Sequence, residues 1–407
     1  MTSRRKFLAG SLATTGLMTF GRPAPAVLRA AAAERSDQER ILVVVELAGG
    51  NDGLNTVIPV KDDRYKAARP TLAIPSAEAI SMGQDTALHP AMTGFADLLQ
   101  QDRLAVVQGV GYPNPNRSHF ESMDIWHTCQ RKDEVRVDGW LGRYLESAAA
   151  QFGSTDPQAL HFGEDKQPFA LMSRQVRVPS VGSLDEFRLL GREKGQFATA
   201  VKQLADARRA PTNDLLGFVQ SSTSSAIEAS ERIEQAAMSD GLSSAYPGNR
   251  LSRKLQTVAR MINSGLKTRV YYVQLNGFDT HARQAGAHTS LLRQVSGAVS
   301  AFVNDMVAHG HGDRVVCLCF SEFGRRVQEN ASEGTDHGTA GPVFLAGSPV
   351  KAGLHGGSPD LGDLIDGDLK HSIDFRRVYA SVLSGWLNSR AESSLRGQYE
   401  PLDLFDV

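Results

Sequence analysis

Acidic and histidine side chains follow several apolar runs of this chain at short spacing. They stand in three segments: Gly-Gly-Asn-Asp-Gly with Asp52, Gly-Phe-Asp-Thr-His with Asp279 and His281, and Gly-Thr-Asp-His-Gly with Asp336 and His337. Carboxylates and imidazoles offer lone pairs at neutral pH, which is what a divalent metal ion requires. A single pair of this kind is a common coincidence. Three such points after separate apolar runs predict a metal site.

A candidate nucleophile, Ser118, stands in Asn-Arg-Ser-His-Phe-Glu. The segment is typical of a helix start, with Ser118 as the N-cap and Glu121 at the capping-box position. From this segment alone, that structural interpretation is favoured. In the functional interpretation, the helix N-terminus attracts an anionic ester and a nearby divalent ion lowers the pKa of the hydroxyl. Arg117 would then hold an oxygen of the ester.

Short runs of β-branched and other apolar residues predict buried strands. They cover residues 41–47, 104–108, 270–275, 315–320 and 343–346. Helical patterns with one apolar face lie between them, at residues 90–101 and 291–307. This alternation predicts an α/β fold with a doubly wound, mostly parallel sheet flanked by helices. Residues from about 186 to 260 are polar and helix-prone, which predicts a helical insertion in that domain.

The composition is that of an ordinary soluble globular protein. Hydrophobic residues make up 41% and charged residues 22% of the 407 residues, which suffice for one large core. The net charge is -1, and no basic stretch is long enough to follow a phosphate backbone. We therefore expect no nucleic-acid partner.

Residues 1–32 are typical of a twin-arginine export signal. Arg4 and Arg5 precede Phe-Leu within a charged start, a weakly apolar stretch follows, and small residues suited to cleavage come after it. The apolar stretch is too short and too polar for a membrane span. We therefore expect the twin-arginine machinery to export the protein to the periplasm or beyond the cell.

The three cysteines do not indicate a disulfide framework. Cys317 and Cys319 lie two apart in a predicted strand, so both point to one face and are poorly placed to bridge each other. Cys129 stands alone. All three are expected to be packing residues.

The segments around these residues occur in the order seen in the bacterial DUF1501 family. They are Gly-Gly-Asn-Asp-Gly-Leu-Asn-Thr, Arg-Ser-His-Phe, Gly-Phe-Asp-Thr-His, Ser-Glu-Phe-Gly-Arg-Arg and Gly-Thr-Asp-His-Gly. The chain resembles that family from about residue 41 to its C-terminus. The family in turn looks like a branch of the alkaline phosphatase and sulfatase superfamily. The resemblance implies an alkaline-phosphatase-like α/β domain over residues 38–407.

The resemblance also implies a site for one or two divalent ions. Asp52, Ser118, Asp336 and His337 match the positions that serve one ion, with Ser118 as the nucleophile. Two ions a few ångströms apart would hold the attacking and leaving oxygens of a displacement. Zinc, manganese, magnesium and calcium all suit such ligands.

The second ion would be held by Asp279, His281 and a late histidine, best His355. The superfamily commonly places this Asp and His four residues apart, whereas here they are two apart. That departure puts the role of His281 in doubt. His355 has a surface-loop interpretation of equal weight, and His89, before a proline, is the substitute.

Glu322 follows another predicted strand in Ser-Glu-Phe-Gly-Arg-Arg. It is either a ligand or base of the site, or the ion-pair partner of Arg325 or Arg326. Active sites of such sheets lie at the carboxyl ends of the strands, so Asp52, Asp279 and Glu322 are expected at one edge. The signature of formylglycine sulfatases is absent from the sequence, which argues against a sulfatase of that type.

These observations predict an exported, metal-dependent hydrolase of small anionic esters, with Ser118 as nucleophile. The rival hypothesis is an envelope binding or scaffold protein in which the same Asp and His residues hold loops together. A mutase or transferase, in which a bound acceptor replaces water, is a further alternative. No sequence feature separates it from a hydrolase.

Overall fold

The first strand, β1 (Ile41–Ala48), occupies the middle of the main sheet. Its run of Ile, Leu and Val is buried on both faces, as expected of a strand covered on each side. It pairs in parallel with β8 (Val270–Asn276) and with β9 (Val315–Phe320). The computed structural model describes residues 40–83, 85–154, 156–163, 166–182 and 245–406.

The strand order of this sheet is β11-β5-β10-β9-β1-β8-β6-β7, and β14 also pairs with β5. The further strands are β5 (Leu104–Gly111), β6 (Ala159–Phe162), β7 (Ser180–Val181), β10 (Gly341–Ala346), β11 (Gly353–His355) and β14 (Ile373–Asp374). Strand β10 runs antiparallel to both β5 and β9, whereas the other described pairs are parallel. The expected α/β class with a mostly parallel sheet is therefore confirmed.

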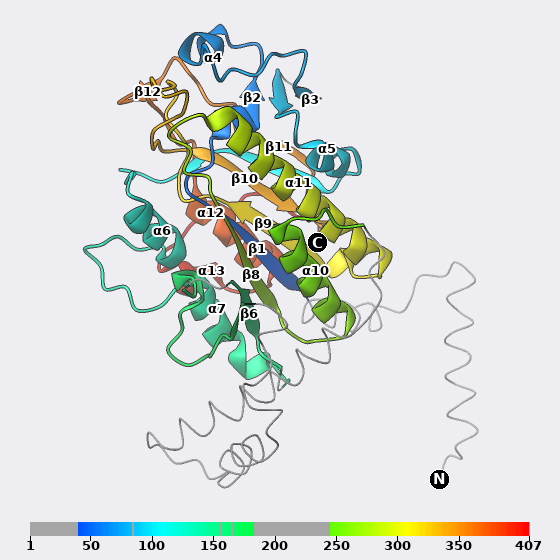
Figure 1. The fold of residues 1–407 in the computed structure, drawn as a ribbon. Coiled ribbons are helices and arrows are strands. Elements are labelled where there is room, and N and C mark those ends of the chain that lie inside the picture. The colour runs from blue at the N-terminus through cyan, green and yellow to red at the C-terminus, as the bar shows by residue number, and fades with distance from the viewer. Residues whose placement is uncertain (1–39, 84, 155, 164–165, 183–244, 407) are drawn as a thin grey trace, which may run out of the picture. The chain divides into compact units, whose positions relative to one another are not determined.

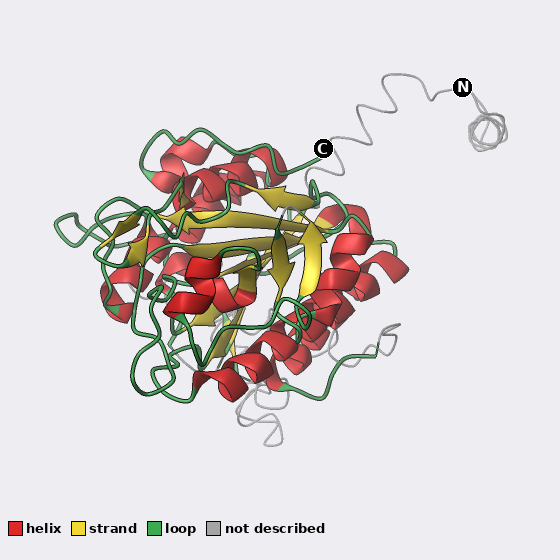
Figure 2. Ribbon diagram, turned by 90° about the horizontal axis from the view of Figure 1, so that it is seen from above, coloured by secondary structure: helices red, strands yellow, loops and turns green. Residues whose placement is uncertain are grey.

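Helices cover both faces of the sheet (Figures 1 and 2). The helices α5 (Thr93–Gln100), α10 (Arg250–Asn263) and α11 (Gln284–Ala308) share a hydrophobic core with Val43 and Val45 of β1. The helices α6 (His119–Thr128), α7 (Trp140–Ala148) and α12 (Phe375–Ala380) share another with Leu42 and Val44. Successive strand residues point to opposite faces, so Glu46 points to the side of α6.

Smaller elements surround the main sheet. A second sheet joins β2 (Val57–Pro59), β4 (Thr86–Leu88) and β3 (Ile80–Gly83), and a third joins β12 (Leu364–Ile365) to β13 (Asp368–Leu369). Short helices are α3 (Gly53–Thr56), α4 (Asp63–Ala68) and α13 (Ala391–Leu395), with a π-helical segment at Ser381–Trp386 and 3-10 turns at Ala149–Gln151, Phe169–Leu171 and Gly312–Arg314. None of the described helices has the length and hydropathy of a membrane span.

The predicted helices and strands are present in the structure, but some of their first and last residues differ from the prediction. Helix α11 begins at Gln284, well before the predicted start at Leu291. Helix α10 falls partly within the predicted insertion, yet it packs into the core through residues such as Leu251 and Leu255. The predicted signal, residues 1–32, and most of the predicted insertion lie outside the described residues. The three cysteines are free and buried, as predicted.

The topology brings several chain segments to one edge of the sheet. Strands β1, β8 and β9 are parallel neighbours, so the segments with Asp52, Asp279 and Glu322 all leave from the same edge. Strand β5 has the same direction, because it is antiparallel to β10, which is antiparallel to β9. The loop after β5 leads to α6 at that edge.

Candidate metal centre and active site

Three side chains at this edge form a group with the composition of a metal site. His119, Asp279 and His337 each offer one ligand atom, and these atoms lie within 4.8 Å of one another. His119 begins α6, Asp279 follows β8, and His337 lies in the loop between β9 and β10. The Nε2 atoms of His119 and His337 are 3.3 Å and 3.1 Å from Oδ1 of Asp279.

The imidazole of His119 is oriented by a buried carboxylate. Its Nδ1 atom lies 2.8 Å from Oε1 of Glu322, which also accepts the backbone N–H of Gly49 at 2.9 Å. Because an ionised carboxylate only accepts, Nδ1 carries the proton and Nε2 is turned to Asp279. The hydrogen bond with Glu322 raises the pKa of His119. Within the described part of the chain, this Nε2 is buried and makes no hydrogen bond.

The imidazole of His337 is oriented in the same way by the backbone. Its Nδ1 donates to the carbonyl oxygen of Arg117 at 2.7 Å. A carbonyl oxygen cannot donate, so Nδ1 holds the proton and Nε2 presents a lone pair. Phe323 lies against the rings of both His119 and His337, with centroid distances of 4.9 Å. These ring contacts and the two Nδ1 hydrogen bonds fix where both Nε2 atoms point.

His281 and Asp336 lie beside this group. The Nε2 atom of His281 is 3.0 Å from Oδ1 of Asp279 and 2.9 Å from Nε2 of His337, while its Nδ1 is 3.1 Å from Asp336. Asp336 also accepts a hydrogen bond from Asn330, which contributes most to lowering its pKa. His281 and Asp336, which the resemblance assigned to different ions, are thus both adjacent to the group.

The buried guanidinium of Arg325 holds the loops that carry the group. It donates to the carbonyl oxygens of Gly50, Thr335 and Phe278 at 2.7–2.9 Å, and also to that of Gly49. The same guanidinium lies 2.7 Å from Asp279. Partial burial acts to raise the pKa of Asp279, but the hydrogen bond from Arg325 and the contact with the imidazole of His337 outweigh it and lower the pKa to about 2.

These observations fit a divalent ion. Metal-ligating histidines typically donate one ring N–H to a carboxylate or carbonyl and turn the other nitrogen to the metal, as His119 and His337 do toward Asp279. The buried Nε2 of His119 has no hydrogen bond among the described residues, as expected of an atom reserved for a cation. Two imidazole nitrogens and a carboxylate are ligands of zinc and related ions.

Asp52, expected to bind a metal, has other partners. Its carboxylate accepts from Arg69 at 2.5 Å and from the amide of Gln284, and it caps α3 by accepting the N–H of Asn55. The side chains of Asp52 and Arg69 are 1% and 0% exposed. Burial would raise the pKa of Asp52, but the charge and hydrogen bond of Arg69 lower it overall. The structure therefore shows Asp52 in a buried ion pair.

Ser118 is the N-cap of α6, but its side chain makes no capping hydrogen bond. Glu121 is paired with Arg136 at 2.5 Å, so the expected capping box is not formed. Ser118 is exposed, and it stands between Arg117, whose carbonyl accepts from His337, and His119. Ser118 is thus the neighbour in sequence of a residue of the group.

Arg117 and Glu322, the other two candidate catalytic residues, have different positions in the structure. The side chain of Arg117 is paired with Asp368 rather than facing the group. Glu322 orients His119 and does not pair with Arg325 or Arg326.

The two further candidate histidines have partners of their own. His355 lies in β11, where its Nε2 donates to the carbonyl of Lys351 at 2.6 Å. The Nδ1 atom of His89 accepts the N–H of Ala91, and burial lowers the pKa of His89 to about 4. Neither histidine belongs to the group of His119, Asp279 and His337.

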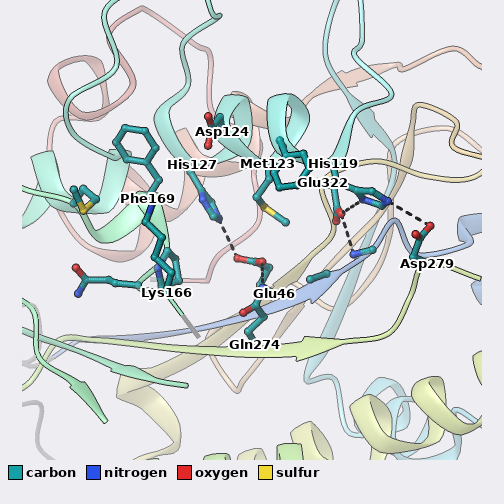
Figure 3. Close-up of a pocket in the computed structure, with 16 residues that line it drawn as sticks. Glu46, His119, Met123, Asp124, His127, Lys166, Phe169, Gln274, Asp279 and Glu322 are labelled. Atoms are coloured by element: carbon teal, nitrogen blue, oxygen red, sulfur yellow. Dashed lines mark hydrogen bonds and ion pairs between the residues drawn. The ribbon is translucent and has the colours of Figure 1, made fainter. Parts of the chain in front are cut away.

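A pocket of about 570 Å³ opens beside the group. His119, Asp279 and Glu322 line one part of it, and it extends along α6 past Glu46 and His127 (Figure 3). From the sequence, His119 was quoted in a helix start and in a family segment without a role of its own, and Glu46 was not singled out. A signal existed for each: an imidazole just after the loop that leaves β5, and a lone carboxylate inside an otherwise apolar strand.

The fold and the site together define an α/β protein with a candidate metal centre at the carboxyl ends of parallel strands. The chain belongs to the family described as "Protein of unknown function (DUF1501)", whose model matches residues 39–382. No curated protein matches the chain.

Several solved structures are similar to the chain. The C-terminal periplasmic domain of EcEptC from Escherichia coli is 10% identical, with a TM-score of 0.35 over 76% of this chain and 73% of that one. The PsFucS1 sulfatase from Pseudoalteromonas sp. is 12% identical, with a TM-score of 0.36 over 83% and 70%. The alkaline phosphatase from the Antarctic bacterium TAB5 is 9% identical, with a TM-score of 0.35 over 78% and 94%. The roles of individual residues rest on this chain's own geometry.

Proposed function

We propose that the protein is an exported, metal-dependent hydrolase of phosphate or related esters. The observation that carries the proposal is the matched orientation of His119 and His337, whose Nδ1 atoms are fixed by acceptors while Nε2 faces Asp279. These three residues would hold one divalent ion, with His281 and Asp336 beside it. Two imidazoles in the set favour zinc over magnesium or calcium.

Ser118 would act as the nucleophile. It lies at the start of α6, between a residue that orients one imidazole and the residue that bears the other. Free N–H groups at the start of this helix favour the negative charge of an ester. Its hydroxyl makes no capping hydrogen bond, so no such bond has to break before it reacts.

The bound ion would lower the pKa of the serine hydroxyl and stabilise charge on the ester oxygens. Ser118 Oγ forms a bond to phosphorus while the bond to the alcohol oxygen breaks. The serine hydroxyl loses one proton in this step and the leaving alcohol oxygen gains one, so the number of protons is unchanged. Water then cleaves the serine ester, which releases phosphate and restores the hydroxyl. His119, held by Glu322, and His337, held by the carbonyl of Arg117, keep the ligand atoms in place.

The test is the metal content of the purified protein, followed by hydrolysis of a set of phosphate and sulfate esters. Wild type is expected to hold a divalent ion, Asp279→Asn to lose it, and His355→Gln to retain it because His355 bonds to a backbone carbonyl elsewhere. Absence of metal from wild type, even after reconstitution, would overturn the proposal in favour of the envelope scaffold. Cleavage of residues 1–32 on secretion in a bacterial host tests the export step.

A further inference from the structure

The pocket continues beyond the candidate metal centre into a part that the ester chemistry does not use. Its floor there is made by Glu46 of β1, Gln274 of β8 and His127 of α6. Its wall carries the apolar side chains of Met123, Phe169 and Met172 together with the polar side chains of Asp124, Lys166 and Gln167. In Figure 3 Glu46 and His127 point toward each other across this region, at a distance from Asp279.

Glu46 is a carboxylate placed inside the sheet. It is 1% exposed, and on the same face of β1 the chain otherwise presents Leu42 and Val44 to the core. Burial alone would raise the pKa of Glu46, but hydrogen bonds from His127, Tyr272 and Gln274 and the charge of His127 lower it overall. A buried carboxylate costs desolvation that an apolar residue would avoid. What Glu46 contributes is the orientation of the side chains that donate hydrogen bonds to it.

The carboxylate determines which atoms its neighbours present. Gln274 donates its amide Nε2 to Glu46 at 2.6 Å, so its carbonyl Oε1 is left as the acceptor. The Nε2 atom of His127 lies 3.0 Å from Glu46 and donates to it. The hydroxyl of Tyr272 also donates to Glu46. The floor is therefore ordered by a buried charge and presents the carbonyl oxygen of Gln274 as an acceptor.

Part of the wall has the opposite character. Phe169 and the two methionines offer apolar contact, and at the start of α6 the side chain of Phe120, which also lines the pocket, is 87% exposed. A ligand that suits both surfaces has C–H groups on its face and O–H groups on its edge. A purely apolar ligand would cover the acceptor of the floor and leave it without a hydrogen bond, which costs binding free energy.

We propose that this part of the pocket binds the alcohol portion of the substrate, and that this alcohol is a hydroxyl-bearing ring of the sugar type. The inference rests on the proposed hydrolase for its biological meaning, but the binding itself does not require the metal. The apolar part of the wall takes the face of the ring, as aromatic and thioether side chains do. The carbonyl oxygen of Gln274 accepts a hydrogen bond from one of its hydroxyl groups. The pocket volume of about 570 Å³ leaves room for such a ring beside the ester group.

The test uses binding and not turnover. Saturation-transfer NMR is recorded on the full chain with a panel of neutral methyl pyranosides, without phosphate and without added metal. At least one glycoside is expected to bind wild type. Gln274→Leu, which keeps the size but removes the acceptor, is expected to weaken that binding about tenfold. Phe169→Ala is expected to weaken it by a similar factor through lost ring contact.

Glu121→Gln is the matched control, because Glu121 lies on the same helix as His127 but pairs with Arg136 and does not line the pocket. It is expected to bind the same glycoside as wild type does. No binding of any glycoside would overturn the inference, as would binding that Gln274→Leu leaves unchanged. If cyclohexanol or tetramethylammonium binds and the glycosides do not, the pocket would be assigned to an apolar or a cationic group instead. Glycoside binding by a protein that never takes up metal would refute the hydrolase while retaining the sugar subsite.

Discussion

The Nδ1 atom of His119 lies 2.8 Å from Oε1 of Glu322, and the same oxygen accepts the backbone N–H of Gly49 at 2.9 Å. One carboxylate thus links the start of α6 to the ends of β9 and β1. Its other oxygen accepts the hydroxyl of Ser321 at 3.0 Å, so both oxygens are engaged. The imidazole of His119, which belongs to a helix, is thereby oriented by residues at the ends of two strands of the sheet.

Glu322→Gln is expected to weaken divalent metal binding about 10- to 100-fold, because the amide no longer draws the Nδ1–H of His119 toward a negative charge. The affinity is measured by titrating the metal-free protein with zinc against a chromophoric chelator. Glu121→Gln is the control on the same helix, since Glu121 pairs with Arg136. Equal zinc affinities for both variants would show that Glu322 does not support the metal centre.

Ser118→Ala is expected to abolish ester hydrolysis while leaving metal content and thermal unfolding unchanged. An N-cap substitution usually costs about 1 kcal/mol, but this hydroxyl makes no capping hydrogen bond, so we expect less than about 0.5 kcal/mol. Asn249→Ala is the matched control, because Asn249 caps α10 by accepting the N–H of Ser252 at 2.8 Å. That variant is expected to lose about 1 kcal/mol. Full activity in Ser118→Ala would reduce the serine to a helix start.

Asp52→Asn is expected to destabilise the fold by about 3–5 kcal/mol, because it leaves the buried guanidinium of Arg69 without its charge partner. Chemical denaturation at neutral pH measures the loss. Asp85→Asn at the exposed pair with Lys61 is the control, with an expected change of at most about 1 kcal/mol. Folded Asp52→Asn protein is expected to retain its metal. If Asp52→Asn loses its metal but keeps its stability, Asp52 would be a metal ligand after all.

The Asp52 pair also predicts a pH dependence. The pKa of Asp52 is lowered in the folded protein, so the unfolded chain binds its proton first as pH falls. The stabilisation is complete above the pKa of an unfolded aspartate, about 3.9, and it is lost as pH falls through the lower pKa of the folded state. The stability difference between wild type and Asp52→Asn should therefore shrink in acid. A difference that stays constant from neutral pH to about pH 3 would contradict this.

Arg325→Lys is expected to lower both thermal stability and metal affinity. A lysine has no planar fork and cannot reach the carbonyls of Gly50, Thr335 and Phe278 together. Arg326→Lys is the control at the next position, where the side chain is 37% exposed. Thermal unfolding with and without zinc checks both effects. Equal behaviour of the two variants would show that the loops do not depend on Arg325.

Much of the fold could be predicted from the sequence, because the strands are nearly continuous runs of β-branched residues and strand alternation needs no long-range information. The order of the strands could not be predicted, because β10 lies between β5 and β9 and pairs with β5, which is far from it in the sequence. The early start of α11 at Gln284 was missed because its first turns lack a clear apolar pattern.

The candidate site was predictable at the level of segments and less so at the level of roles. Asp279 and His337 were named from the sequence and lie in the group, whereas Asp52 pairs with Arg69, whose proximity no local pattern reveals. His119 was present in the quoted motif, but its orientation depends on Glu322, 203 residues away. Side-chain partners of that separation are a product of the tertiary fold.

The bonds of Arg325 have one more consequence. The loops after β1 and β8 and the loop before β10 converge on a cation that is part of the chain, so their arrangement does not rely on the ion that would bind there. An ion can then leave or be exchanged without the loops coming apart. If the proposed export carries the protein between compartments with different metals, the positions of the ligand atoms would stay the same while the ion changes.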